Sequence, residues 1–205
     1  MGLQRPRAVI FDVGNVLYDW NIRLLFEQLV ADPDELDVLL RDVVTMEWHG
    51  QHDAGRPFAE TSAELIALYP RFATAIAAYG PRFNDTVPGM LPGMAAVVEA
   101  LDARRVPLYA ITNFSAEFWE PFHDREAAIF DRFRDIVVSG REKLIKPDPA
   151  IYRLALERFG LRPDEAIFID DRADNIEAAE RLGIYGHHFQ GAEPLAEELT
   201  ALGLL

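Results

Sequence analysis

The sequence predicts an α/β protein, a doubly wound parallel sheet with a helical segment inserted after its first strand. Two observations lead to this prediction. Short apolar runs alternate with amphipathic segments between residues 94 and 202, a pattern typical of parallel strands connected by helices. Residues 19–86, in contrast, space their apolar side chains only as helices do.

The elements follow in order along the chain. The first strand is Ala8–Phe11, a continuous apolar run of the kind buried on both faces of a sheet. Helical spacing then covers residues 22–29, 36–43, 58–68 and 72–79, and the turn-rich residues 87–93 mark a boundary. Beyond it we expect strands at 107–111, 136–138, 166–169 and 184–189, with helices at 94–105, 115–122, 149–160, 175–182 and 194–202. The predicted domains are a core of residues 1–18 and 87–205 and a helical cap subdomain of residues 19–86.

Composition excludes several classes of protein. The 205 residues include 20 basic and 34 acidic side chains, a net charge of −14, so nucleic acid and anionic membranes are poor partners. The chain has no cysteine, which excludes disulfides, iron–sulfur clusters and thiolate zinc sites. No apolar run reaches the roughly 18 residues of a membrane-spanning helix, and the N-terminus lacks a secretory signal pattern. We therefore expect a cytoplasmic protein, monomeric or homodimeric.

Polar side chains follow the ends of the predicted strands. They are Asp12, Thr112, Asn113, Lys146, Asp170 and Asp171. Because an open parallel sheet binds its ligands at the carboxyl ends of its strands, we expect these side chains in one site. Three carboxylates in one pocket repel each other, and Mg²⁺ is the ordinary cation that neutralises such a cluster. Lys146 and Thr112 can then hold a phosphate through an ammonium and a hydroxyl.

Four segments of the chain resemble, in order, the motifs of the haloacid dehalogenase (HAD) hydrolase superfamily. They are Phe11–Leu17, Ala110–Phe114, Lys146–Tyr152 and Phe168–Asn175. The helical insertion also resembles the first type of cap domain of that superfamily, so the likeness covers nearly the whole chain. It implies a Rossmann-like core and a phosphatase that acts on a small phosphorylated metabolite.

The resemblance also implies a role for each residue at the strand ends. Asp12 would be the nucleophile that forms an aspartyl-phosphate, with Lys146 as its catalytic partner. Phosphate binding would fall to Thr112, Asn113 and Lys146. Mg²⁺ would be held by Asp12, the backbone carbonyl of Gly14, Asp170 and Asp171.

Position 14 departs from the family pattern. Most phosphatases of the superfamily carry there a second Asp that protonates the leaving group, whereas Gly14 has no side chain. Asn15, which follows, tolerates the left-handed turn expected at this point. The Asp-x-Gly-Asn-Val segment resembles phosphatases acting on sugar 1-phosphates. The missing acid predicts a preference for esters whose alcohol leaves easily, unless His49 or His52 replaces it.

Other interpretations stay open. A 2-haloacid dehalogenase would use Asp12 to displace halide without a metal, but it typically carries an aromatic residue where Gly14 stands, and the pair Asp170–Asp171 favours a phosphatase. A HAD-fold binding or regulatory protein has Gly14 as its only support. The interval between cap helices that holds His49, His52, Asp53 and Arg56 is interpreted as an exposed loop, with a specificity loop as the alternative. We expect the cap to pivot at residues 17–19 and 87–93.

Overall fold

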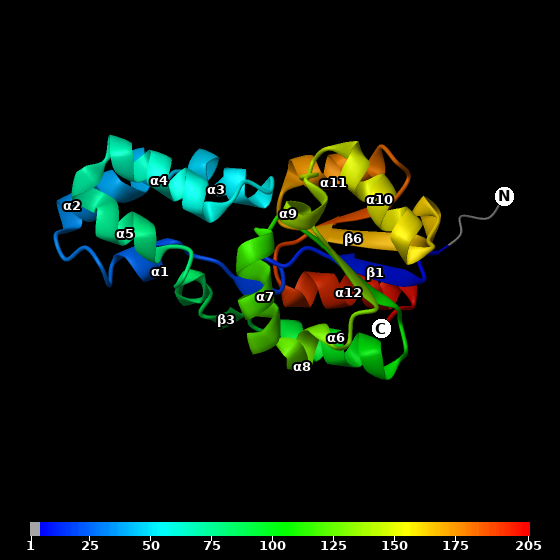
Figure 1. Cartoon of the computed structure of the whole chain (residues 1–205). Helices are drawn as coiled ribbons and strands as arrows, with labels where there is room; N and C mark the ends of the chain where they lie inside the picture. Colours follow the sequence, from blue (N-terminus) through cyan, green and yellow to red (C-terminus); the bar gives the residue numbers. More distant parts are fainter. Residues whose placement is uncertain (1–4) are drawn as a thin grey trace.

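The computed structural model describes residues 5–205 (Figure 1). Five strands form a parallel sheet in the order β5-β4-β1-β6-β7. Their bounds are β1 (Ala8–Phe11), β4 (Leu108–Thr112), β5 (Asp135–Val138), β6 (Ala166–Asp170) and β7 (Tyr185–His188). The predicted doubly wound parallel sheet is confirmed, with strand ends that differ from the prediction by at most one residue.

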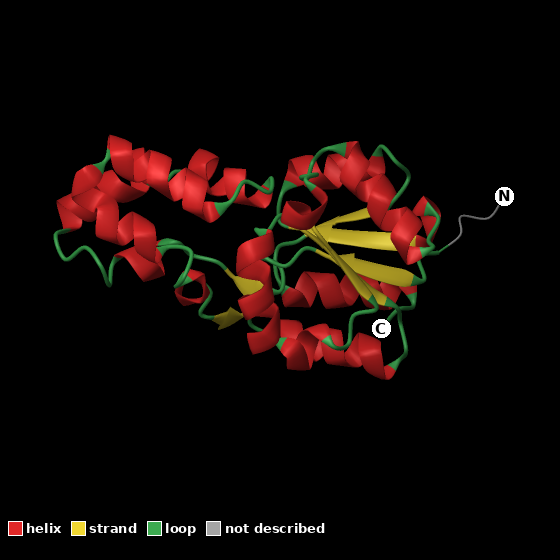
Figure 2. Ribbon diagram, in the orientation of Figure 1, coloured by secondary structure: helices red, strands yellow, loops and turns green. Residues whose placement is uncertain are grey.

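Helices cover both faces of this sheet, as Figure 2 shows. One face packs against α6 (Met94–Ala103), α7 (Ala116–Arg125), α8 (Ala127–Phe130) and α12 (Ala192–Leu202). The other face packs against α10 (Pro149–Phe159) and α11 (Ala173–Glu180). Val9 and Phe11 point to the first face, while Ala8 and Ile10 point to the second, and all four are fully buried. A strand covered on both faces needs an unbroken apolar run, which is why β1 shows no alternation.

Local signals place the ends of α10 where the sequence predicts them. The Asp148 carboxylate accepts a hydrogen bond from the Ala150 backbone N–H at 2.8 Å and caps the helix. Pro149 occupies the first helical position, where its missing N–H is not needed. The helix stops at Gly160, whose φ of +64° lies in the left-handed region that glycine adopts without strain. In the described part of the chain, no helix has the length and apolar character needed to cross a membrane.

Between β2 (Tyr18–Asp19) and β3 (Gly89–Met90) the chain forms a helical insertion, residues 20–88, which stands apart from the sheet in Figure 1. Its helices are α1 (Arg23–Phe26), α2 (Pro33–Val38), η1 (Leu39–Val43), α3 (Met46–Asp53), α4 (Phe58–Leu68), η2 (Pro70–Phe72), α5 (Ala73–Ala78) and η3 (Phe83–Thr86). Every apolar stretch predicted to be helical contains one of these elements. No strand occurs within residues 20–88, all of which are described.

The interpretation of the interval between cap helices as an exposed loop is wrong for His49, His52 and Asp53, whereas Arg56 lies after the helix and is half-buried. His49, His52 and Asp53 belong to helix α3, and all three are buried. Apolar spacing does not reveal this helix because its buried face carries Trp48, two histidines and an aspartate instead of aliphatic residues. The sequence signal that could have found it is Thr45, whose hydroxyl accepts a hydrogen bond from the Trp48 backbone N–H at 3.2 Å.

The two connections between the insertion and the core lie side by side. Strands β2 and β3 pair antiparallel, with Tyr18 opposite Met90, and the Leu91 N–H donates to the Leu17 carbonyl at 2.9 Å. The segments expected to act as pivots therefore form one short ribbon. A separate packing contact joins the two parts where Phe83 stacks on Phe118 of α7, with ring centroids 4.9 Å apart.

Candidate active site

Asp12 lies at the carboxyl end of the central strand β1. Its N–H donates to the Ile169 carbonyl at 2.8 Å, which fixes the backbone against the neighbouring strand β6. Its carboxylate accepts a hydrogen bond from the Val13 N–H at 2.7 Å. The chain then turns through Asn15, whose φ of 57° is the expected left-handed conformation. A Cβ placed on Gly14 would meet no atom within 4 Å, so the position of the missing side chain is open space.

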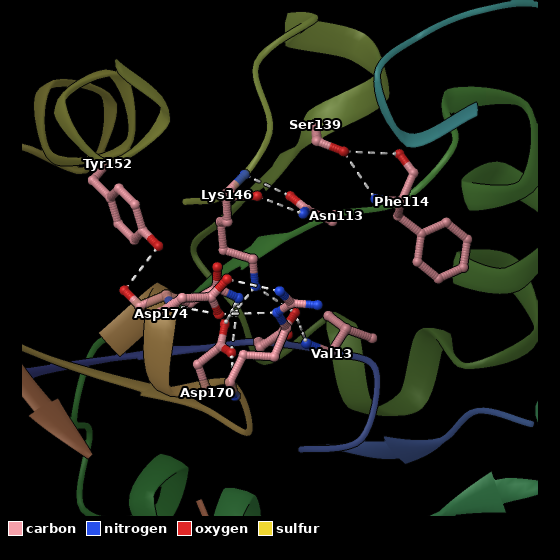
Figure 3. Close-up of polar contacts among 11 residues, drawn as sticks. Val13, Asn113, Phe114, Ser139, Lys146, Tyr152, Asp170 and Asp174 are labelled. Carbon is pink, nitrogen blue, oxygen red and sulfur yellow. Dashed lines mark hydrogen bonds and ion pairs between the residues drawn. The ribbon is translucent and has the colours of Figure 1, made fainter. Parts of the chain in front are cut away.

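Lys146 joins Asp12 to Asp170. Its Nζ lies 2.8 Å from Asp12 Oδ1 and 2.7 Å from Asp170 Oδ2, and the lysine side chain is only 1% exposed. Figure 3 shows Lys146 extending toward Asp170 at the end of β6. Burial acts to lower the pKa of Lys146, but the charges of Asp12 and Asp170 outweigh it, so the pKa is raised and the ammonium persists.

Asp170 is oriented by its neighbours in the following helix. Asn175 Nδ2 donates to both Asp170 oxygens, at 2.9 and 3.0 Å, and the Arg172 N–H donates to Oδ1 at 2.9 Å. The Tyr152 hydroxyl donates to the Asn175 carbonyl at 3.0 Å and holds that turn in place. This role of Asn175 is not predicted by the sequence pattern. Its place in the first turn of α11, five residues after Asp170, was the available signal.

Asp12, Asp170 and Asp171 form an acidic cluster, each with an oxygen atom within 4.8 Å of the others. Three carboxylates face one ammonium, which leaves two excess negative charges when all are ionised. Burial raises the pKa of Asp12 to about 7, with Lys146 opposing and Asp170 adding to the shift, and burial also raises the pKa of Asp171. Carboxylate oxygens are the ligands that hard divalent cations prefer. The cluster therefore fits a divalent metal ion, with Asp12 and Asp171 on its cavity side.

Asn113 and Thr112 occupy the end of β4. The Asn113 amide donates from Nδ2 to the Lys146 carbonyl at 3.0 Å and accepts from the Lys146 N–H at 2.8 Å (Figure 3). It therefore fixes the backbone that carries the lysine. Thr112 is 1% exposed and is not among the described residues that line the cavity. Their predicted contacts with phosphate stay predictions.

A cavity of about 250 Å³ opens over the acidic cluster, between the core and the helical insertion. The core contributes Asp12, Val13, Gly14, Asn15, Tyr18, Asn113, Phe114, Phe122, Asp171 and Arg172 to its wall. The insertion contributes Trp20, Met46, His49, Asp53, Phe83 and Val87. A concave wall of mainly apolar and aromatic groups, with few polar ones, is typical of sites for small organic ligands.

A hydrogen-bonded contact fixes α3 against the core beside this cavity. The Ser139 hydroxyl donates to the Asp53 carbonyl at 2.6 Å and accepts from the Phe114 N–H at 2.9 Å. Ser139 begins the short helix α9 (Ser139–Glu142), and Phe114 follows the end of β4. One buried side chain thus connects the insertion to the loop beside the acidic cluster.

The fold and this site define an α/β enzyme with a buried carboxylate and an acidic cluster at the carboxyl edge of its sheet, covered by a helical insertion. The chain belongs to the haloacid dehalogenase-like hydrolase family, whose model matches residues 6–183. It is accordingly a hydrolase of the HAD superfamily.

Named relatives include phosphatases. A sesquiterpene phosphatase of Aspergillus oryzae is 26% identical over 202 residues, which cover 96% of each chain. Acyl-CoA dehydrogenase family member 10 of Mus musculus is 27% identical over 213 residues, but these cover 96% of this chain and only 19% of the mouse protein. A HAD family enzyme of Bacteroides thetaiotaomicron, solved as a magnesium complex, shares the fold with a TM-score of 0.73 at 18% identity, covering 95% of this chain and 98% of that one.

Proposed function

We propose that the protein is a Mg²⁺-dependent phosphatase that hydrolyses a small phosphomonoester through an aspartyl-phosphate on Asp12. The observation that carries the proposal is the position of Asp12, on the wall of the cavity and within the acidic cluster, with its carboxylate 2.8 Å from the Lys146 ammonium. A carboxylate placed in this way can attack phosphorus while the lysine balances charge. The phosphatase names among the relatives support the same class of reaction.

Each residue at the carboxyl edge has a proposed role. Asp12 forms the bond to phosphorus, and Lys146, Thr112 and Asn113 bind or position the phosphoryl group. Mg²⁺ would be held by Asp12, the Gly14 carbonyl, Asp170 and Asp171, and it would neutralise the charge of the carboxylates and of the phosphate. The magnesium complex of the Bacteroides enzyme supports this choice of ion.

The finer proposal is that the substrate is a sugar 1-phosphate. It rests on the likeness of the Asp12–Val16 segment to that branch of the superfamily. The cavity supports it too, because its wall combines the aromatic residues Trp20 and Phe83 with polar His49 and Asp53. Comparing hexose 1-phosphates with the matching 6-phosphates by kcat/KM tests the proposal, and a preference for the 6-phosphates would contradict it.

We also propose the domain division expected from the sequence, a core of residues 1–18 and 87–205 and a cap of residues 19–86. The cap would close over the site and exclude water, pivoting at the paired segments β2 and β3. Closure would be stabilised by the Ser139 hydroxyl, which bridges the insertion and the core.

Replacing Ser139 by alanine tests this closure. The change leaves the Asp53 carbonyl and the Phe114 N–H without their buried partner, a loss of about 1–3 kcal/mol for an unsatisfied polar group. Because the loss falls on the closed form, we expect kcat/KM for phosphate esters to decrease about 10-fold. The matched control is Ser62→Ala, since Ser62 is also buried but bonds only to Ala59 within its own helix. Equal kcat/KM in both variants would contradict the closure proposal.

Phosphate release from 4-nitrophenyl phosphate, measured with Mg²⁺ and after its removal by a chelator, tests the proposed function. We expect turnover only with the metal. Chloride release from 2-chloropropionate without metal would instead indicate a dehalogenase. Binding of phosphate esters with no turnover would indicate a binding protein.

Asp171→Ala should weaken the response to Mg²⁺ and activity together, because it removes a carboxylate that faces the cavity. We expect the Mg²⁺ concentration for half-maximal activity to increase by about 10–100-fold. The control is Asp164→Ala, an exposed aspartate in the turn η4 (Pro163–Glu165) before β6. Lower activity with an unchanged Mg²⁺ requirement would show that Asp171 is not a metal ligand.

A further inference from the structure

The proposed reaction needs a proton for the alcohol that leaves, and the core supplies no free group for it. The described cavity wall carries these ionisable side chains: Asp12, Tyr18, His49, Asp53, Asp171 and Arg172. Asp12 is the nucleophile, and Asp171 belongs to the acidic cluster. The Tyr18 hydroxyl already donates to Glu126 at 3.0 Å, and a guanidinium does not release its proton in proteins. His49 and Asp53, both on α3, are the remaining pair.

One hydrogen bond and one close contact connect these two side chains to Tyr79. The Tyr79 hydroxyl lies 2.7 Å from His49 Nδ1, and His49 Nε2 lies 3.3 Å from Asp53 Oδ2. Burial raises the pKa of Tyr79 well above 10 and lowers the pKa of His49 to about 4, so the phenol keeps its proton and the imidazole is neutral. The phenol can donate to Nδ1, and the single N–H of the ring can then donate from Nε2 to Asp53 Oδ2.

The second oxygen of Asp53 has no such partner. Asp53 is 8% exposed, and its Oδ1 is buried without a hydrogen bond to any described residue, although the side chain lies on the cavity wall. A buried carboxylate oxygen without a donor is costly when charged, and a proton on that oxygen removes the cost. A proton on either oxygen neutralises the carboxyl group, so we place a proton on Asp53. Burial raises the pKa of Asp53 to about 7, although the Lys146 charge and a hydrogen bond from the Ser115 backbone N–H act to lower it, and this agrees with a carboxyl group that can hold a proton.

We propose that Asp53 is the acid of this hydrolase, donating its carboxyl proton to the leaving oxygen, and that His49, held by Tyr79, is its positioning residue. The inference rests on the proposed phosphatase function and deepens it. It places a catalytic residue on the helical insertion, across the cavity from Asp12.

The proton and electron pairs balance in both steps. In the first, an Asp12 oxygen forms a bond to phosphorus, the bond from phosphorus to the ester oxygen breaks, and that oxygen takes the Asp53 proton to leave as a neutral alcohol. In the second, water attacks the same phosphorus while the Asp53 carboxylate accepts a proton from it. The bond from Asp12 to phosphorus breaks, phosphate is released, and Asp53 is protonated again.

This assignment changes two expectations drawn from Gly14. His52 is not a replacement acid, because its Nε2 is bound to the Thr61 hydroxyl at 2.7 Å and it does not line the cavity. A preference for esters whose alcohol leaves easily is also not expected of the natural protein on the ground of a missing acid. We expect that preference to emerge only when Asp53 is replaced, so the sugar 1-phosphate proposal depends on the cavity and on the resemblance alone.

Two substrates of similar shape separate an acid from a merely structural residue. The 4-nitrophenolate of 4-nitrophenyl phosphate leaves without help, whereas the alkoxide of 4-nitrobenzyl phosphate needs a proton. The experiment measures kcat/KM for both with the natural protein, Asp53→Asn, and the control Glu47→Gln, which removes an exposed carboxylate from the same helix. Because both rates come from one preparation, their ratio does not depend on how much of the variant has folded.

For Asp53→Asn we expect kcat/KM on 4-nitrobenzyl phosphate to fall by about 10²–10⁴-fold, the usual contribution of general acid catalysis, and on 4-nitrophenyl phosphate by a much smaller factor. Glu47→Gln should give the natural ratio. Asp53→Ser, a smaller residue that cannot act as an acid, should give the same selective loss and guards against a folding defect peculiar to the amide.

Equal losses on the two substrates would overturn the proposal, because they would show a structural role. No loss on either would overturn it as well. If the natural protein hydrolyses neither ester with Mg²⁺, the phosphatase function itself fails. A natural protein that hydrolyses only 4-nitrophenyl phosphate would leave the phosphatase function standing and show that the site has no working acid.

Discussion

Asp12→Asn should lower phosphate release by on the order of 10⁴-fold or more, because an amide is a poor nucleophile and removes one oxygen from the acidic cluster. The fold should persist, since an asparagine of the same size can still accept the Val13 N–H through its side-chain oxygen. The measurement is kcat/KM on 4-nitrophenyl phosphate with saturating Mg²⁺.

The matched control for this change is Asp164→Asn, the same substitution at an exposed position in η4, before strand β6 begins. Its activity should equal that of the natural protein. In the natural protein, acid quenching during turnover should trap a phosphoryl group on Asp12, which mass spectrometry can locate. The Asp12→Asn variant should show no phosphoryl group at this position. Comparable turnover by Asp12→Asn would refute a covalent mechanism at this residue.

Lys146→Met should reduce both stability and activity. The substitution keeps most of the volume of the side chain but leaves the Asp12 and Asp170 carboxylates without the ammonium that lies within 2.8 Å of each. Breaking a buried ion pair by removing one partner costs about 3–5 kcal/mol. The free energy of unfolding, measured by urea denaturation with a chelator present, should fall by that amount. Loss of the charge beside the transferred phosphoryl group should lower kcat by about 10²–10³-fold.

Lys143→Met provides the comparison, because Lys143 is exposed and lies three residues earlier in the same loop. Its free energy of unfolding should stay within about 0.5 kcal/mol of the natural value, as is usual for surface positions. If the two variants unfold at the same urea concentration, the ion pairs of Lys146 contribute nothing to stability. If Lys146→Met lowers the free energy of unfolding but leaves kcat unchanged, the lysine is structural and does not act on the phosphoryl group.

The sheet and the edge that carries the acidic cluster could be predicted from the sequence. Ala8–Phe11 and Ala166–Ile169 are continuous apolar runs, and such runs need burial on both faces wherever they lie. Once the strands are parallel, their carboxyl ends share one edge, so Asp12, Lys146 and Asp170 had to converge there. The cap of α10 at Asp148 is a contact between near neighbours in the chain, and it is equally visible in the sequence.

The part of the cavity wall that the helical insertion contributes could not be predicted from the sequence. Helix α3 owes its buried face to polar contacts with distant residues, such as His49 with Tyr79 and His52 with Thr61, and such contacts leave no apolar period in the sequence. The placement of Asp53 over the core depends on the Ser139 hydroxyl, which is 86 positions away. The local sequence around Asp53 fits an exposed turn as well as it fits a helix that faces a cavity. Long-range packing decides between the two. The Asp53 carboxylate becomes buried, and its Oδ1 is left without a partner among the described residues, only when the insertion folds against the core.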